Sequence, residues 1–197
     1  GFKKDWLMTE KKIDFKGKHV LVMGLGLHGG GVGTVKFLVS RGARVTVTDL
    51  RTKKVLQPSL EKLADVKGIT YVLGKHRNQD FIRSDLIVKN PGVPPISPYV
   101  ALAAKHKVPV TTDMGIFFRE CPGMIIGITG TRGKSTTAWL IWKFLKTKYK
   151  RVFLGGNIRK SVLEFLPELK QGDLIVLELS SFQLQDLSLD RVSPPIA

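Results

Sequence analysis

The chain has 197 residues, 43% of them hydrophobic, which is enough for one large domain or two modest ones. No apolar run is long enough for a membrane span, and the single cysteine, Cys121, excludes an internal disulfide, so we expect a cytoplasmic protein. The formal net charge is +16, but the lysines are scattered without interleaved aromatics. We therefore expect no nucleic-acid partner and a basic surface that favours a polyanionic small ligand.

The first motif follows a predicted buried strand at residues 18–23. Residues 24–29 read Gly-Leu-Gly-Leu-His-Gly, a GxGxxG pattern, and helical spacing resumes at 32–39. A second strand, 44–48, ends at Asp49, 20 residues after the third glycine. The pattern is typical of a nicotinamide or flavin site with Asp49 on the ribose. The alternative is that the glycines only pack the helix against the strand.

The remaining elements of the first domain alternate between helical and extended patterns. We predict helices at 58–66 and 99–106 and strands at 69–73, 85–88 and 108–111. A proline-rich loop, 90–95, follows the strand at 85–88, and such loops bind ligands in open α/β sheets. Residues 1–112 are thus predicted to form a doubly wound α/β domain with a boundary near Asp113.

A second glycine-rich stretch, residues 127–137, reads Gly-Ile-Thr-Gly-Thr-Arg-Gly-Lys-Ser-Thr-Thr. It lies between an apolar run at 124–126 and a predicted helix at 138–145, the usual setting for a phosphate cradle. Lys134 would reach the outer phosphates and Ser135 would coordinate Mg²⁺. Because Ile128 stands where a strict GxxxxGK[ST] pattern has glycine, the motif is a variant, and a glycine turn with a surface lysine is the alternative.

Downstream, a predicted strand at 151–154 runs into Gly-Gly-Asn-Ile at 155–158, and a short helix is expected at 161–166. The apolar strand 173–179 carries Glu178 near its end. A carboxylate in that position after a phosphate loop is typical of a metal ligand in nucleotide hydrolases, whereas the alternative is a solvated strand end. Residues 192–197 are predicted to begin another strand, which would make 113–197 an incomplete P-loop ATPase-type α/β domain.

Six motifs in this order resemble those of the Mur ligases, the ATP-dependent amide ligases of peptidoglycan precursor synthesis. The motifs are residues 24–29, 49–51, 90–93, 127–136, 155–158 and 178–184. The last, Glu-Leu-Ser-Ser-Phe-Gln-Leu, is most similar to that of the D-glutamate-adding members. The resemblance implies that a Rossmann-like first domain binds the UDP part of the substrate rather than a nicotinamide. It also implies that 113–197 are the first part of the central ATP-binding domain.

The resemblance assigns roles by matching position. Lys134 and Glu178 would be catalytic, and Ser135 and Glu178 would hold Mg²⁺. The implied ATP-binding residues are Gly130, Thr131, Arg132, Gly133, Lys134, Ser135 and Thr136. The implied UDP-substrate residues are Leu25, Gly26, Leu27, His28, Gly29, Asp49, Arg51, Asn157, Ser180 and Gln183. Two positions depart from the family pattern: Arg132 stands where Asn is usual, and His28 where Ser or Thr is common.

The implied reaction joins D-glutamate to UDP-N-acetylmuramoyl-L-alanine. ATP, with Mg²⁺, phosphorylates the terminal carboxylate of the UDP substrate, and the amine of D-glutamate attacks the acyl phosphate. We expect a monomer without membrane insertion, and an inactive fragment, because the family's later metal-binding His, carbamylated Lys and C-terminal domain have no counterpart in the chain. Three alternatives stay open: a Mur ligase for another amino acid, a nicotinamide-dependent oxidoreductase, and a basic nucleic-acid-binding module.

Overall fold

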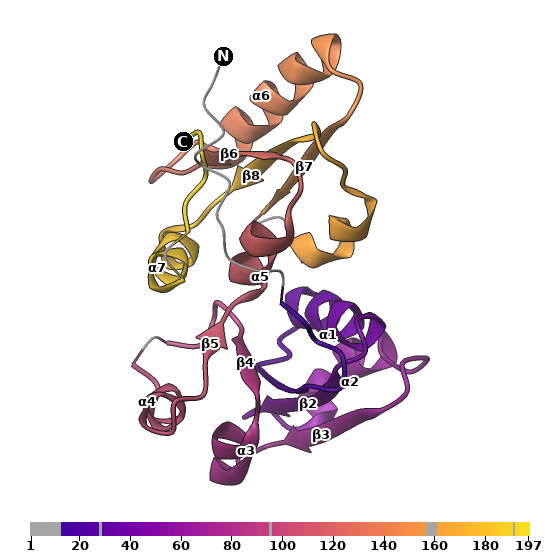
Figure 1. Cartoon of the computed structure of the whole chain (residues 1–197), viewed down its shortest axis with the longest axis vertical. Helices are drawn as coiled ribbons and strands as arrows, with labels where there is room; N and C mark the ends of the chain where they lie inside the picture. The colour runs from indigo at the N-terminus through magenta and orange to yellow at the C-terminus, as the bar shows by residue number, and fades with distance from the viewer. Residues whose placement is uncertain (1–12, 28, 95, 157–160, 191) are drawn as a thin grey trace. The chain divides into compact units, whose positions relative to one another are not determined.

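The computed structural model describes residues 13–197 except 28, 95, 157–160 and 191 (Figure 1). The described residues form two compact units, each with its own parallel sheet. The first unit contains residues 14–113 and 161–164, and the second contains 114–156, 165–197 and Ile13. This architecture confirms the predicted α/β class with parallel sheets. Among the described residues, no helix has the length and apolar character needed to cross a bilayer.

The sheet of the first unit has five parallel strands in the order β3-β2-β1-β4-β5. The strands are β1 (His19–Met23), β2 (Arg44–Asp49), β3 (Ile69–Leu73), β4 (Leu86–Lys89) and β5 (Val110–Thr111). All five were predicted, although β5 is two residues shorter. The apolar runs of the central strands β1 and β4 suit strands that are covered on both faces. The strand order reverses between β1 and β4, which places a crevice at the carboxyl ends of these two strands.

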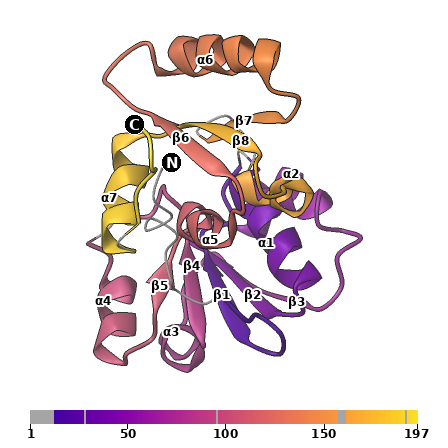
Figure 2. The same ribbon diagram turned by 45° about the horizontal axis from the view of Figure 1, so that its top comes forward.

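Four helices cover this sheet: α1 (Gly30–Ser40), α2 (Lys53–Glu61), α3 (Asn78–Arg83) and α4 (Pro98–Lys105). Figure 2 shows α1 and α2 on one side of the sheet and α3 and α4 on the other. Leu21 of β1 packs in a cluster with Phe81 of α3 and Ala103 of α4. The predicted helix at 58–66 is misplaced: α2 begins at Lys53 and Pro58 lies inside it. The short α3 was not predicted.

The second unit contains a three-stranded parallel sheet in the order β6-β8-β7. Its strands are β6 (Met124–Ile128), β7 (Val152–Gly156) and β8 (Leu174–Glu178), as predicted to within two residues. Ile196 adds one parallel bridge to Ile126 on the edge of β6, where a further strand was expected. The long helix α6 (Lys134–Lys148) lies along this sheet (Figure 2) and packs on it through Ala138, Ile141 and Trp142.

The other segments of the second unit are α5 (Asp113–Glu120), which begins at the last residue of the first unit, and α7 (Ser181–Leu189). The helix predicted at 161–166 is instead two 3-10 turns, η1 (Val162–Glu164) and η2 (Leu166–Glu168). Pro167 follows Leu166, and the residue before a proline disfavours helical backbone, which is consistent with a break at this point.

Candidate nucleotide-binding sites

The glycine loop, residues 24–29, joins the carboxyl end of β1 to the first residue of α1. Gly29 is the N-cap of α1 with a φ of 91°, a left-handed conformation that strongly favours glycine. Leu25 is buried, and Leu27 is exposed. His28 lies outside the described residues, so its predicted contact with the UDP substrate has no structural account. The loop presents backbone at a helix N-terminus, where anions are stabilised.

Asp49, at the end of β2, is bonded to the glycine loop itself. Its Oδ2 accepts hydrogen bonds from the backbone N–H groups of Leu25 and Gly26, at 2.9 and 3.2 Å. Its Oδ1 accepts from the N–H of Arg51 at 2.9 Å and lies 3.6 Å from the half-exposed Arg51 guanidinium. The structure therefore brings four predicted UDP-site residues together: Leu25, Gly26, Asp49 and Arg51.

His76 lies close to this group, beyond β3. Its Nδ1 is 2.6 Å from the Oγ1 of Thr48, and its ring packs edge-on against Phe81 and Tyr99. Burial lowers the pKa of His76, and the negative charge of Asp49 opposes that shift. A neutral imidazole is thus favoured near the carboxyl edge of the sheet.

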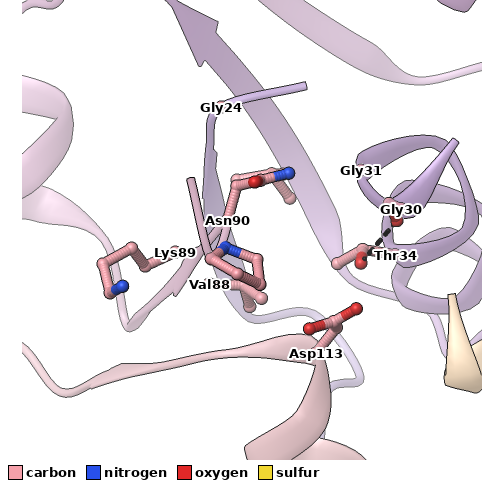
Figure 3. Close-up of a pocket in the computed structure, with 10 residues that line it drawn as sticks. Gly24, Gly30, Gly31, Thr34, Val88, Lys89, Asn90 and Asp113 are labelled. Carbon is pink, nitrogen blue, oxygen red and sulfur yellow. Dashed lines mark hydrogen bonds between the residues drawn. The ribbon is translucent and has the colours of Figure 1, made fainter. Parts of the chain in front are cut away.

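A recess opens between β1, β4 and the start of α1, at the point where the strand order reverses (Figure 3). Gly24, Gly30, Thr34, Asn90 and Asp113 contribute to its lining. Asn90 and Thr34 are held locally: Asn90 Oδ1 accepts from the Gly92 N–H at 3.0 Å, and the Thr34 hydroxyl donates to the Gly30 carbonyl. Lys89 directs its ammonium to the Val93 carbonyl, 3.1 Å away. The sequence signalled this recess through residues 90–93, but neither Thr34 nor Asp113 carried a recognisable pattern.

The second glycine-rich loop joins β6 to α6 in the second unit. Gly133 is the N-cap of α6 with a φ of 76°. The Lys134 ammonium folds back onto the loop, where it donates to the Gly130 carbonyl at 2.8 Å. Thr131, Arg132, Ser135 and Thr136 are exposed. All seven predicted ATP-binding residues therefore lie on one solvent-accessible turn and the first turn of its helix.

Glu178 ends β8, the central strand of the second sheet. Its Cα pairs in register with Ile128 of β6 and Gly156 of β7, so it stands at the edge of the sheet from which the loop with Lys134 departs. The residue is 5% exposed, and within the described part of the chain its carboxylate has no hydrogen-bond or ion-pair partner. Among the described residues, no three or more His, Cys, Asp or Glu side chains are grouped closely enough to hold a metal ion. One carboxylate and one hydroxyl, from Glu178 and Ser135, nevertheless suit Mg²⁺, which binds few protein oxygens when nucleotide phosphates supply others.

Ser180 and Gln183 have a local role that was not foreseen. The Gln183 N–H donates to the Ser180 hydroxyl at 3.2 Å, and the Ser180 N–H donates to the Gln183 side-chain oxygen at 2.9 Å. This capping box starts α7 and is readable from the spacing Ser-x-x-Gln. Asn157 lies outside the described residues.

Two family models match the chain. The Mur ligase MurD-like N-terminal domain matches residues 18–112, and the Mur ligase middle domain matches residues 128–197. The chain belongs to the Mur ligase family.

Individual relatives agree with these matches. The chain is 48% identical to a UDP-N-acetylmuramoylalanine–D-glutamate ligase of Roseiflexus sp. (strain RS-1), over 94% of this chain and 40% of that protein. It is 39% identical to the protein of the same name from Treponema pallidum (strain Nichols), over 91% of this chain and 34% of the relative. The chain thus spans about 40% of the length of curated relatives that it matches.

A murein peptide ligase from Psychrobacter arcticus shares the fold, with a TM-score of 0.51 at 15% identity over 90% of this chain and 42% of that one. Membership of the Mur ligase family accounts for both glycine-rich loops, whereas the nicotinamide interpretation used only the first. The family assignment therefore does not favour the oxidoreductase alternative.

Proposed function

We propose that these residues belong to an ATP-dependent amide ligase that adds D-glutamate to UDP-N-acetylmuramoyl-L-alanine. The observation that carries the proposal is the 48% identity to a relative named for D-glutamate addition, which extends over 94% of this chain and hence over both matched domains. We further propose that the protein acts as a monomer in the cytoplasm.

In this proposal the first unit is a Rossmann-like domain for the UDP substrate. Its parallel strands change order between β1 and β4, and the glycine loop and the recess lie at that point. Leu25–Gly29 would face the diphosphate, and the half-exposed Arg51 guanidinium would face the uracil end. Asp49 belongs to the same site through its bonds to the loop. In the second unit, the residues predicted to contact the UDP-muramoyl substrate are Asn157, Ser180 and Gln183.

The second unit would be a P-loop-type domain for ATP. The loop Gly130–Thr136 opens at the amino end of α6, where backbone N–H groups and the helix dipole favour phosphate. Lys134 would exchange its bond to the Gly130 carbonyl for the phosphates. Ser135 and Glu178 would hold Mg²⁺, which neutralises phosphate charge when bound.

The chemistry needs these residues for charge rather than for proton transfer. A substrate carboxylate that attacks a phosphoryl group brings two anions together, so the site must supply fixed positive charge and oriented N–H groups. Lys134 and the loop amides are placed to supply both. The acyl phosphate would then react with the amine of D-glutamate.

ATP binding tests the assignment of the second unit without requiring turnover. We expect Lys134→Ala to weaken binding of a fluorescent ATP analogue with Mg²⁺ at least about tenfold, the usual scale for losing a charged contact. Lys148→Ala, at the opposite end of α6, is the matched control and should change the dissociation constant less than about twofold. Equal affinity of the wild type and the Lys134 variant would contradict the assignment.

A further inference from the structure

The backbone of Leu25 and Gly26 is held by three different elements of the first unit. Asp49, from the end of β2, accepts from the N–H groups of both residues. Ser59, on α2, donates its hydroxyl to the Gly26 carbonyl at 2.7 Å. Gly31, on α1, stands so close that a Cβ there would lie 2.2 Å from the Leu25 carbonyl oxygen. The backbone of these two residues is therefore fixed from several sides.

Asp49 has little capacity left for a ligand. It is 2% exposed, and its two oxygens already accept three backbone N–H groups and face the Arg51 guanidinium. An ionised carboxylate offers about four acceptor positions, so these partners nearly saturate it. The acid at the end of the second strand in dinucleotide-binding folds usually bonds a ribose hydroxyl. In this chain, Oδ2 of the equivalent acid, Asp49, instead accepts hydrogen bonds from backbone N–H groups of the glycine loop.

Ser59 is 0% exposed, so it cannot touch a ligand bound at the loop. It nevertheless fixes the carbonyl of Gly26, while Asp49 fixes the N–H of the same residue. Any effect of Ser59 on binding must therefore act through the backbone of the loop. No sequence motif singled it out.

We propose that Asp49 and Ser59 are positioning residues: they preset the glycine loop for the diphosphate of the UDP substrate, and Asp49 does not itself bind the nucleoside. This inference rests on the proposed function of the first unit. A loop that is already ordered loses less conformational entropy when it binds, which strengthens binding of the group that it contacts. The benefit falls on the diphosphate, because that is the part of the ligand that meets the loop.

The test compares UDP with uridine, both titrated into the 197-residue chain and followed by NMR. We expect Ser59→Ala to weaken UDP binding about three- to tenfold, the scale of one hydrogen bond, and to leave uridine binding within about twofold. Asp49→Asn should show the same pattern with a larger loss, because its NH₂ group would face N–H donors. Ser84→Ala removes a comparable buried bond, to the Asp80 carbonyl at 2.6 Å just before β4, and should change neither affinity.

Amide hydrogen exchange supplies a readout that needs no ligand. The N–H groups of Leu25 and Gly26 should exchange faster in Ser59→Ala and Asp49→Asn than in the wild type or Ser84→Ala. Loss of uridine binding in Asp49→Asn equal to its loss of UDP binding would overturn the proposal, as would unchanged exchange and UDP affinity in Ser59→Ala. A wild-type chain that binds no UDP would contradict the proposed function, and the exchange comparison would still decide the positioning role.

Discussion

Gly33 of α1 lies directly against Ser161, the residue before η1. A Cβ at Gly33 would lie 2.6 Å from the Cβ of Ser161 and 2.7 Å from the Glu164 carboxylate. Val162 and Leu163 are buried, and their segment belongs to the first unit although the chain on either side belongs to the second. The absence of a side chain at Gly33 is thus what lets residues 161–164 dock on the first helix.

We predict that Gly33→Ala destabilises the chain by about 1–3 kcal/mol, since the added methyl group overpacks this contact. Gly30→Ala, in the same helix, meets nothing within 4 Å and should be neutral or slightly stabilising. Urea unfolding followed by circular dichroism measures both. Equal stability of the two variants would show that the contact with Ser161 is dispensable.

Asp173 and Arg151 form a two-point ion pair, with Arg151 Nε 2.6 Å from Oδ1 and Nη2 2.9 Å from Oδ2 of the carboxylate. The hydrogen bonds from Arg151 hold the pKa of Asp173 below its ordinary value, with help from the Lys170 N–H and against burial. The folded state therefore binds this proton less readily than the unfolded state does. The stability from this pair is present above the unfolded pKa of about 3.9 and is lost as pH falls through the lower folded pKa.

Asp173→Asn should therefore be less stable than the wild type at neutral pH, and the difference should shrink as the pH falls below about 4. Free energies of unfolding from pH 3 to 7 test this dependence. A difference that is constant across the range would mean that the charge of Asp173 contributes nothing.

Cys121 is predicted to be unreactive. Burial raises its pKa to about 11, despite a weak contact from its sulfur to the Gly123 carbonyl. Since the thiolate is the nucleophile, alkylation by iodoacetamide at pH 8 should run about 100-fold slower in the folded chain than in urea. Comparable rates in the two conditions would contradict the interpretation of Cys121 as a structural thiol.

Gly156 supports the proposed metal ligand. Its φ is 107°, and a Cβ there would lie 2.1 Å from the backbone carbonyl oxygen of Glu178. Gly156→Ala should push β7 from β8 and weaken binding of Mg²⁺-ATP more than binding of ATP without metal. Gly172→Ala is the control, because it imposes a similar backbone strain at a φ of 89° with nothing within 4 Å. An equal effect of both variants on Mg²⁺-ATP binding would remove the specific role of Gly156.

Local patterns predicted the sheets well and the short helices poorly. The apolar runs of β1 and β8 identify buried strands, because strands covered on both faces show continuous hydrophobic residues. The helix predicted at 58–66 begins at Pro58, whereas α2 begins at Lys53 and carries this proline internally. The six residues of α3 are too few to show a helical period. The turn η1 packs on α1, a contact between segments far apart in the sequence that no local pattern reveals.

The candidate sites also contain some residues that local sequence patterns predict and others that depend on contacts between distant segments. Lys134, Ser135 and Glu178 can be predicted as site residues from the sequence, because each lies in or beside a strand-to-helix connection that local patterns identify. The actual partners of Asp49 were not foreseen, because its hydrogen bonds to Leu25 and Gly26 depend on the parallel pairing of β1 with β2, which brings the end of β2 beside the loop. No sequence pattern marked Ser59 as a functional residue, since an isolated serine in a helix is common.

The central claim is that the two loops bind two different nucleotides, one a UDP substrate and the other ATP. Calorimetric titration of the 197-residue chain with UDP-N-acetylmuramoyl-L-alanine tests it most directly, in the absence and presence of a saturating non-hydrolysable ATP analogue with Mg²⁺. We predict one UDP-substrate site per chain that persists when the ATP analogue is bound. Displacement of the UDP substrate by the ATP analogue or by NAD⁺, or no binding at all, would contradict it.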